Sequence, residues 1–365
     1  MILAPRQCVF LTAAGCILLI VVTLYRYSPI ASDRKPEQSA SSSSPASPTR
    51  NASNSTLGVS LPFPIHKTCR YQPQDQFQAI FALSAGPSWR TRGLLAAANL
   101  TGLEITLPPQ PPIPADLVTA FQALGDSVHP TRGASKAWLA HLDLIKHIHQ
   151  SNLDTALILE DDVDWDRRLR AQTPLIAAAV RNLTHFSPTE DNNDAPYGRA
   201  WDLLWLGHCG EYWEEGIETV VFDDPTAIPH AQYSGWARGY LARLPDCRRA
   251  VYRSYNPVCS FAYALSRDGA RKVLELVGGG GDEAFDIAVM HHCRAGRLEC
   301  LSVVPEVVHQ YFPAERFGVK SLVDVGNGEG DGSREEDFEA VMGSTENILE
   351  SARCRALWRQ TCLRE

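Results

Sequence analysis

The chain has 365 residues, of which 44% are hydrophobic, and it carries a formal net charge of −8. This length suits one large or two ordinary domains, and the composition is that of a globular protein. The acidic balance argues against a nucleic-acid-binding protein, which usually presents a basic face. Local arginines or a metal ion can still bind an anionic substrate in an acidic chain.

An uncharged apolar segment runs from Cys8 to Tyr25, close to the ~20 residues that cross a bilayer. No small-residue cleavage site follows closely, so we expect a signal-anchor helix rather than a cleaved signal peptide. Acceptor triplets for N-glycosylation follow on its C-terminal side, at Asn51, Asn54, Asn99 and Asn182. The sequence therefore predicts a single-pass type II membrane protein of the Golgi or endoplasmic reticulum, with a luminal body.

Ten cysteines suit an oxidising compartment, and eight of them follow the predicted span. Their pairing cannot be deduced from sequence, but the short loop with Gly296 favours a bridge between Cys293 and Cys300. A zinc site is the alternative, and the absence of a Cys-x-x-Cys motif argues against it.

Composition divides the chain into four parts. Residues 1–27 are the expected tail and anchor, and the Ser- and Pro-rich residues 28–65 are an expected disordered stem. A catalytic domain is predicted over residues 66–320, and an acidic, Gly-rich segment with C-terminal helices over residues 321–365.

The first elements alternate between strand and helix, which predicts an α/β fold with a Rossmann-type sheet flanked by helices. Strands are expected at Phe77–Leu83 and Leu103–Leu107, and helices at residues 94–100, 115–124 and 134–150. His141 shares the apolar face of the last of these helices. We expect a packed core histidine there rather than a catalytic one.

An apolar run, Ala156 to Leu159, ends in the acids Glu160, Asp161, Asp162, Asp164 and Asp166. Such a run is typical of a strand buried on both faces, and ligands bind outside the carboxyl ends of strands in open α/β sheets. Clustered carboxylates suit Mg²⁺ or Mn²⁺. The alternative is a solvated acidic loop. In an extended chain Glu160 and Asp162 point to one side and Asp161 to the other.

The second half of the chain continues the pattern. Strands are expected at residues 201–206, 258–265 and 298–304, and helices at 174–183, 267–276, 285–293, 337–349 and 352–362. Residues 211–250 show little periodicity and are rich in aromatic residues, which could stack on sugars or pack in the core.

Several stretches together resemble glycosyltransferase family 25, which includes lipooligosaccharide and collagen galactosyltransferases, and above all its fungal membrane-anchored branch. The matching stretches are GASKAWLAHL from Gly133, ALILEDDV from Ala156, WDLLWLGHCG from Trp201, PVCSFAYALSR from Pro257 and Phe285-Asp286. The resemblance implies a GT-A fold, a nucleotide-sugar donor such as a UDP-hexose, Mn²⁺ (or Mg²⁺) and inversion at the anomeric carbon. It also implies a glycan or glycoprotein acceptor.

The site residues follow from this resemblance and from the acids. Asp162 is the expected metal ligand, because it is common to both possible acid pairs, Glu160-x-Asp162 and Asp162-x-Asp164. Asp164 is a candidate second ligand, with Glu160 as the alternative. Glu160 and Asp161 are candidates for donor binding.

Four further candidates have ordinary alternatives. Asp286 is the candidate base for the acceptor hydroxyl, or else a helix-terminus acid favoured by the dipole. His309 is a further candidate metal ligand, or a structural histidine. Arg90 and Arg92 are candidates for donor binding, or solvated arginines.

The predicted function is transfer of a hexose, with galactose favoured, from the nucleotide donor to an acceptor hydroxyl. A metal-dependent phosphoester hydrolase and a sugar-binding relative without turnover are the alternatives. Retention of the acids and Asp286 argues against the latter.

Overall fold

A computed structural model describes residues 77–125, 128–186, 195–213, 216–314, 317 and 335–364. The predicted anchor and stem lie outside these residues, as does Cys69. Among the helices described, none is both long and apolar enough to cross a membrane. The description below concerns the compact unit that begins at Phe63.

An eight-stranded sheet forms the centre of this unit, in the order β2-β1-β3-β8-β5-β9-β7-β6. Its strands are β1 (Ala79–Leu83), β2 (Ile105–Thr106), β3 (Thr155–Glu160), β5 (Leu203–Gly207), β6 (Thr219–Asp223), β7 (Arg248–Arg253), β8 (Ala262–Ser266) and β9 (Cys300–Val304). β3 pairs in parallel with β1, and β8 runs antiparallel between β3 and β5. The carboxyl ends of β3 and β5 therefore lie at the same edge as the start of β8. The sheet is mixed, as the resemblance implied.

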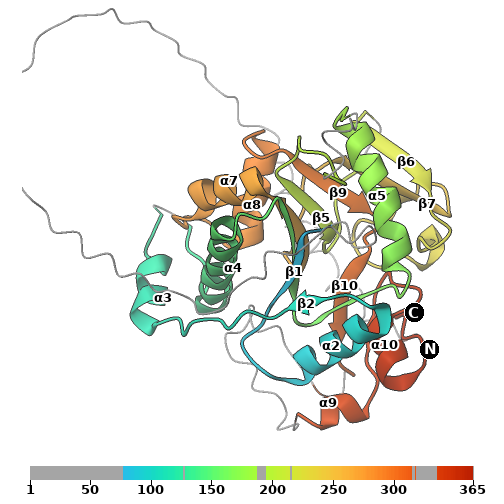
Figure 1. The fold of residues 1–365 in the computed structure, drawn as a ribbon, viewed down its shortest axis with the longest axis horizontal. Helices are drawn as coiled ribbons and strands as arrows, with labels where there is room; N and C mark the ends of the chain where they lie inside the picture. Colours follow the sequence, from blue (N-terminus) through green and yellow to red (C-terminus); the bar gives the residue numbers. More distant parts are fainter. Residues whose placement is uncertain are drawn as a thin grey trace, which may run out of the picture. The chain divides into compact units, whose positions relative to one another are not determined.

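Helices cover both faces of this sheet (Figure 1). One face packs against α4 (Arg132–Gln150), α7 (Arg267–Val277) and α8 (Phe285–Arg294), with α3 (Ala115–Gln122) against α4. The other face packs against α5 (Leu169–Leu183) and α2 (Trp89–Thr101). Side chains of β3 alternate between the two cores: Ala156 and Ile158 face the first, Leu157 and Leu159 the second. This explains why the run before the acids is apolar throughout.

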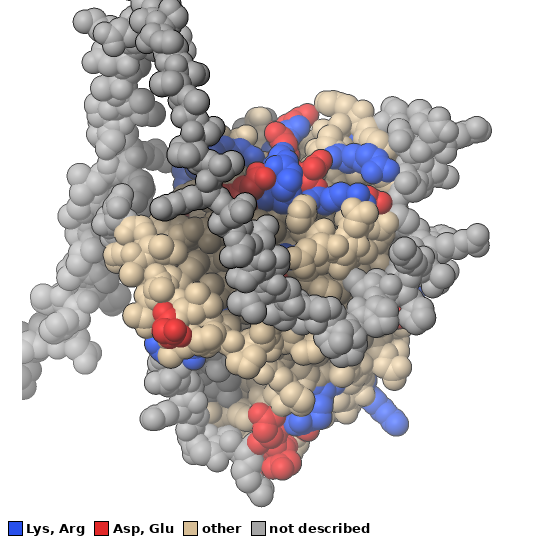
Figure 2. Space-filling model, turned by 60° about the vertical axis from the view of Figure 1, so that its left-hand side comes forward, with Lys and Arg blue, Asp and Glu red and all other residues tan. Residues whose placement is uncertain are grey.

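Figure 2 shows the molecule turned so that the side of α3 and α4 comes forward. Basic and acidic side chains gather together in its upper part, and a broad uncharged area lies below them. Charges of both signs are mixed in that upper group. On α7 such a mixture takes the form of an ion pair between Arg271 Nη1 and Glu275 Oε2, 2.8 Å apart.

A second sheet of three strands lies beyond the end of β3, in the order β11-β10-β4. It is formed by β4 (Val163–Trp165), β10 (Val308–Phe312) and β11 (Ser344–Thr345). Sequence analysis assigned no strand to any of these segments. The prediction of a helix over residues 337–349 is wrong, because only α9 (Asp337–Ala340) is helical before β11 begins. The chain is already extended at Val341, and Gly343 lies so close to β10 that a Cβ there would clash with the carbonyl oxygen of Phe312.

The last helix, α10 (Ala352–Trp358), packs along α2. The C-terminal residues therefore complete the same unit as the main sheet. Residues 211–250 are more regular than the sequence suggested, since they contain β6, a short helix α6 (Arg238–Leu241) and the start of β7.

Three disulfides join described residues. The expected Cys293–Cys300 bridge is confirmed, and Cys209–Cys259 and Cys354–Cys362 accompany it. Cys247 is exposed and unbridged among the residues that the structure covers.

Candidate active site

The acidic residues lie where the chain leaves the main sheet at the end of β3 and enters the three-stranded sheet at β4. β3 ends at Glu160, residues 161 and 162 form a turn, and β4 begins at Val163. We call Glu160, Asp161 and Asp162 the acidic turn. Its backbone is held on both sides: Glu160 N donates to Phe261 O at 2.9 Å, and Tyr311 N donates to Asp162 O at 2.7 Å. Because the chain turns here, the alternation expected of an extended strand does not apply, and each carboxylate has its own surroundings.

Asp162 is the most unusual of the three acids. Its Oδ1 atom is inaccessible to solvent and has no hydrogen-bond partner among the described residues. Burial, together with the charges of Glu160 and Asp161, raises the pKa of this carboxyl to about 7, against the charges of Arg90 and Arg353. A buried oxygen without a donor costs free energy unless something binds it. A hard cation is the ligand that suits a carboxylate oxygen among other carboxylates.

Asp161 faces the loop after β1. Its Oδ2 atom accepts a hydrogen bond of 2.5 Å from Ser84 Oγ. Burial raises the pKa of Asp161, while the Ser84 hydroxyl and the charge of Arg90 lower it. Arg90, in the first turn of α2, thus acts on both Asp161 and Asp162. Its guanidinium lies 5.4 Å from the centre of the Trp89 ring.

Glu160 faces the opposite way, toward α4 and the start of β8. Ser260 Oγ donates to Glu160 Oε1 at 3.1 Å, and His141 Nε2 lies 3.6 Å from the same oxygen. His141 is buried, as expected, and its Nδ1 atom lies 2.9 Å from the hydroxyl of Tyr263. The histidine expected only to pack in the core therefore also reaches the acidic turn.

Asp286 begins α8 and lies near the acidic turn. Its Oδ2 atom accepts a hydrogen bond of 2.6 Å from Cys259 N. Burial raises its pKa, the backbone donors lower it, and the charge of Glu160 raises it. The neighbouring Phe285 ring stacks on His141 with centroids 4.7 Å apart. The fold therefore brings Asp286 close enough to Glu160 for their charges to interact, across more than 120 residues of sequence.

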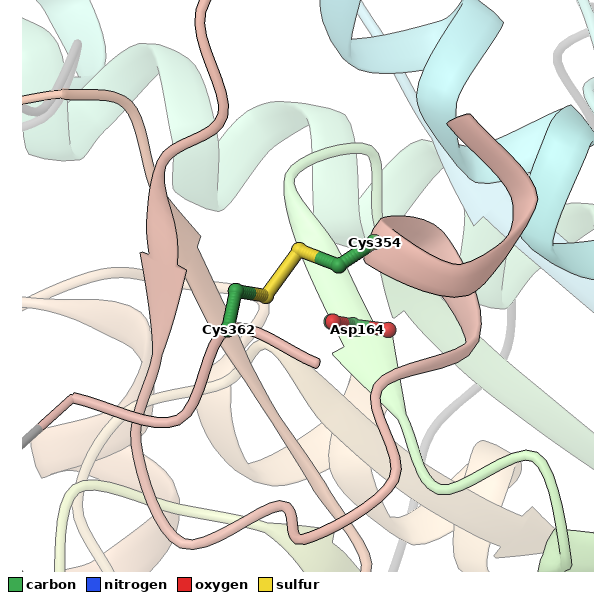
Figure 3. A group of neighbouring side chains, drawn as sticks. All are labelled: Asp164, Cys354 and Cys362. Atoms are coloured by element: carbon green, nitrogen blue, oxygen red, sulfur yellow. A yellow bond between two sulfur atoms is a disulfide. The ribbon is translucent and has the colours of Figure 1, made fainter. Parts of the chain in front are cut away.

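Asp164 lies apart from this group, inside the small sheet. Its oxygens accept hydrogen bonds from Trp165 N at 2.8 Å, from Arg353 N at 3.0 Å and from Ser351 Oγ. Figure 3 shows its carboxylate beside Cys354 and Cys362, whose sulfur atoms are joined in a disulfide and offer no thiolate to a metal. Its contacts are those of a structural residue. We therefore leave Asp164 out of the metal site expected from sequence.

Two other candidates, Arg92 and His309, pair with acids outside the acidic turn. Arg92 is exposed and pairs with Glu339 at 2.7 Å and Glu335 at 3.4 Å, so its charge is engaged on the surface. His309 is buried, with Nε2 3.6 Å from Glu306 Oε1 and 4.0 Å from Glu346 Oε2. These contacts give His309 a place in a buried polar cluster and no contact with Asp162.

Sequence analysis missed a buried cation beneath the acidic turn. Arg353, in the first turn of α10, is 1% exposed, and its Nη2 atom donates to the carbonyl oxygen of Asp161 at 2.9 Å. The only local signal was Ser351, whose hydroxyl caps α10 by accepting from Cys354 N. Nothing in the sequence linked that cap to acids almost 190 residues earlier.

No family model matches the chain. A stretch of 129 residues is 27% identical to procollagen galactosyltransferase 1-B of Xenopus laevis. The match covers 33% of this chain and 17% of the length of that protein. The chain is thus related to a glycosyltransferase over a third of its length.

Proposed function

We propose that the protein is a glycosyltransferase that moves a hexose, galactose in the first instance, from a nucleotide-sugar donor to an acceptor hydroxyl. The observation that carries this proposal is the buried, unpartnered Oδ1 of Asp162 within the acidic turn. It lies at the carboxyl end of a central strand, where α/β folds bind their ligands. The similarity to a galactosyltransferase supports the same function.

We assign a divalent cation, Mn²⁺ or Mg²⁺, to Asp162, whose buried Oδ1 atom has no hydrogen-bond partner among the described residues. Glu160 is the neighbouring acid whose charge acts on Asp162, and its own side chain turns toward Ser260. A bound cation would offset the charge that develops on a leaving diphosphate. Arg90 stands beside the same carboxylates with a permanent positive charge, and we assign it to the donor phosphates. We assign Asp161, whose Oδ2 atom accepts from Ser84 Oγ, to a ribose hydroxyl of the donor.

Asp286 is the residue that we assign to the acceptor. Transfer with inversion needs a base that removes the proton of the attacking hydroxyl. Burial raises the pKa of Asp286 above that of an ordinary carboxylate, which makes it a stronger base once ionised. The amide of Cys259 donates to its Oδ2 atom, and the backbone amides of Ile287 and Asp286 also act on this carboxylate.

An exposed row of aromatic rings offers a place for the acceptor. The ring centroids of Trp236 and Tyr240 are 5.9 Å apart, those of Tyr240 and Tyr212 are 4.8 Å apart, and those of Tyr212 and Tyr255 are 5.4 Å apart. Trp236 is 50% exposed and packs over Gly210, next to the Cys209–Cys259 bridge whose Cys259 amide holds Asp286. Aromatic rings with polar edges suit the apolar faces and hydroxyls of a sugar ring. We call Trp236, Tyr240, Tyr212 and Tyr255 the aromatic row.

A donor-hydrolysis screen tests the proposed activity. The purified chain is incubated with several nucleotide sugars, with Mn²⁺ or with a chelator, and release of the nucleoside diphosphate is measured. We expect hydrolysis of one donor class that needs the metal and falls at least about 100-fold in Asp162→Asn, since a carboxylate ligand is lost.

The matched control is Asp223→Asn, at an acid on β6 whose side chain is 79% exposed. It should keep the hydrolysis rate of the unchanged chain. Hydrolysis that survives in Asp162→Asn contradicts the assigned site. Absence of hydrolysis with every donor contradicts the transferase.

A further inference from the structure

Arg353 is among the largest fully buried side chains of the described protein. Its guanidinium carbon lies 5.0 Å from the ring centre of Tyr311 and 6.0 Å from that of Trp89. The helix opposite makes room for it: a Cβ on Gly93 would stand 2.8 Å from that carbon. The absence of a side chain at Gly93 therefore leaves space that the guanidinium of Arg353 fills.

This cation joins two segments that the proposed function assigns to the donor. Its Nη2 atom donates to the carbonyl oxygen of Arg90 at 2.9 Å and to that of Asp161 at 2.9 Å. Arg90 stands in the first turn of α2, and Asp161 belongs to the acidic turn. A single nitrogen thus fixes the spacing between the arginine that we assign to the phosphates and the acids that we assign to the metal.

The charge of Arg353 also matters to the acids. Burial lowers its pKa, and the charges of Asp164, Asp162 and Asp161 act in the opposite direction. A buried guanidinium stays protonated in proteins, so it supplies a permanent positive charge beneath three carboxylates. Its Nε atom is buried and has no hydrogen-bond partner among the residues that the structure describes, where the side chain is held by its Nη2 contacts and by the aromatic rings.

The backbone of Arg353 is fixed on both sides. Its amide donates to Asp164 Oδ1 at 3.0 Å, and the next residue, Cys354, is bridged to Cys362. Both cysteines are buried, and the bridge closes a loop of eight residues. Ser351 caps the same turn through its hydroxyl, which donates to Asp164. The short helix α10 is thus tied down at the residue that carries the cation.

We infer that Arg353 is a positioning residue for the donor and metal site, and that the Cys354–Cys362 bridge holds it there. The inference rests on the proposed function, because it concerns the same acids and the same Arg90. Without the guanidinium the start of α2 and the acidic turn lose their common donor. Arg90 and Asp162 then no longer meet one ligand in a fixed geometry, and affinity for a metal–diphosphate falls.

Binding of Mn²⁺ and UDP to the purified full chain tests this by titration calorimetry. The variants are Arg353→Met, which keeps an unbranched apolar stem, and the double variant Cys354→Ser with Cys362→Ser. The matched control is Cys293→Ser with Cys300→Ser, which opens a bridge of similar span, seven residues against eight. Equal loop lengths predict similar losses of stability in the two double variants.

We expect Arg353→Met and the Cys354/Cys362 variant to bind UDP with Mn²⁺ at least about tenfold more weakly than the unchanged chain. The Cys293/Cys300 variant should stay within about twofold of it. Equal weakening in both double variants, or none in Arg353→Met, overturns the positioning role.

Amide hydrogen exchange gives a readout that needs no ligand. The amide of Tyr311, which donates to Asp162 O, should exchange at least about tenfold faster in Arg353→Met, and the amides of β5 should not change. If the unchanged chain fails to bind UDP, the proposed function fails, and the exchange at Tyr311 still decides the positioning role. Unaltered exchange at Tyr311 contradicts it.

Discussion

His141 Nε2 lies 3.3 Å from Ser260 Oγ, and the Ser260 hydroxyl donates in turn to Glu160. Since that hydroxyl proton goes to the carboxylate, the Nε2 proton of a neutral imidazole is the one that reaches Ser260. The Nδ1 atom then accepts from the hydroxyl of Tyr263, 2.9 Å away. One directed chain of hydrogen bonds therefore runs from β8 through α4 back to the acidic turn.

Replacing His141 by phenylalanine keeps the stack on Phe285 and removes both hydrogen bonds. We expect a loss of about 1–3 kcal/mol of stability, since Tyr263 is left unpaired in the core. Donor hydrolysis should fall about tenfold or more, because the Ser260 hydroxyl that donates to Glu160 loses its contact with His141 Nε2. Thermal unfolding and the hydrolysis assay measure the two effects. Tyr263→Phe is the control, because it removes only the hydrogen bond between the Tyr263 hydroxyl and His141 Nδ1. Full activity in His141→Phe would show that His141 contributes to packing only.

Metal binding should depend on pH through Asp162. Its pKa is raised to about 7, so at lower pH the carboxyl holds a proton that a cation must displace. Affinity for Mn²⁺ should therefore rise as the pH increases from 6 to 8, with release of a proton that calorimetry in buffers of different ionisation enthalpy detects. Asp162→Asn should bind Mn²⁺ weakly at both pH values. An affinity that does not change over this range would assign the metal to other residues.

Asp286→Asn distinguishes the two possible roles of Asp286, a catalytic base and an acid that only stabilises the first turn of α8. The amide oxygen can still accept from Cys259 N, so the fold should survive. Transfer to an acceptor should fall about 100-fold or more with little change in donor binding, because general bases contribute about 10²–10⁴ in rate. Loss of the dipole interaction alone is worth about 0.3–1 kcal/mol of stability.

Asp268→Asn is the matched control for Asp286→Asn. Asp268 stands in the first turn of α7, with an 80% exposed side chain, so it tests the same helix-dipole interaction away from Glu160. Transfer should be unaffected there. Similar small effects of both substitutions on stability, with no loss of transfer in Asp286→Asn, would make Asp286 a helix-terminus acid.

The aromatic row predicts a variant defective only toward the acceptor. Trp236→Ala removes a half-exposed ring and should leave stability and donor hydrolysis unchanged. The KM for a carbohydrate acceptor should rise about two- to tenfold, since stacking on an aromatic ring contributes about 0.5–1.5 kcal/mol. Leu117→Ala, at a 46% exposed residue of α3, controls for loss of surface apolar area. An unchanged acceptor KM would place the acceptor elsewhere.

Glu211 predicts how stability changes with pH. It is fully buried, and burial raises its pKa from 4.5 to about 7 despite hydrogen bonds from Tyr212 N, Asn256 N and Ser302 Oγ. The folded state keeps the proton that the unfolded chain loses near pH 4.5, so this residue makes the fold less stable as pH rises from about 4.5 to 7. The change is about 3 kcal/mol at most, at about 1.4 kcal/mol for each pKa unit.

Glu211→Gln isolates this contribution. Its side-chain oxygen can accept from the two amides and its nitrogen can donate to Ser302, so the pH dependence of unfolding should flatten. Denaturant unfolding at pH 5 and pH 8 measures it. An equal dependence in both proteins would show that Glu211 is ionised in the fold throughout this range.

Hydrophobic periodicity predicted most of the central sheet and its helices, because those segments bury one or both faces. Apolar residues from Ala156 to Leu159 led directly to a strand packed on both sides. The short strands β4 and β11 were missed, because two or three residues carry no readable period. Their partners in β10 are more than 30 residues away.

The candidate site likewise contains residues that could be identified from the sequence and residues that could not. Glu160, Asp161, Asp162 and Asp286 could be named because each stands at the end of a recognisable strand or helix. In the sequence, Asp164 could not be distinguished from the other acids. Its oxygens accept hydrogen bonds from Ser351 and Arg353 inside the protein, which only the structure shows. Arg353 itself could not be found, since its role depends on a carbonyl 263 residues away in the chain.

That separation also sets the order in which the site can form during synthesis. The loop after β1 leaves the ribosome first, the acidic turn follows, and α10 emerges only much later. Hydrogen bonds that span 192 and 263 residues cannot close until then. Until α10 has been made, a nascent chain carries the carboxylates of the acidic turn without the cation that later lies beneath them.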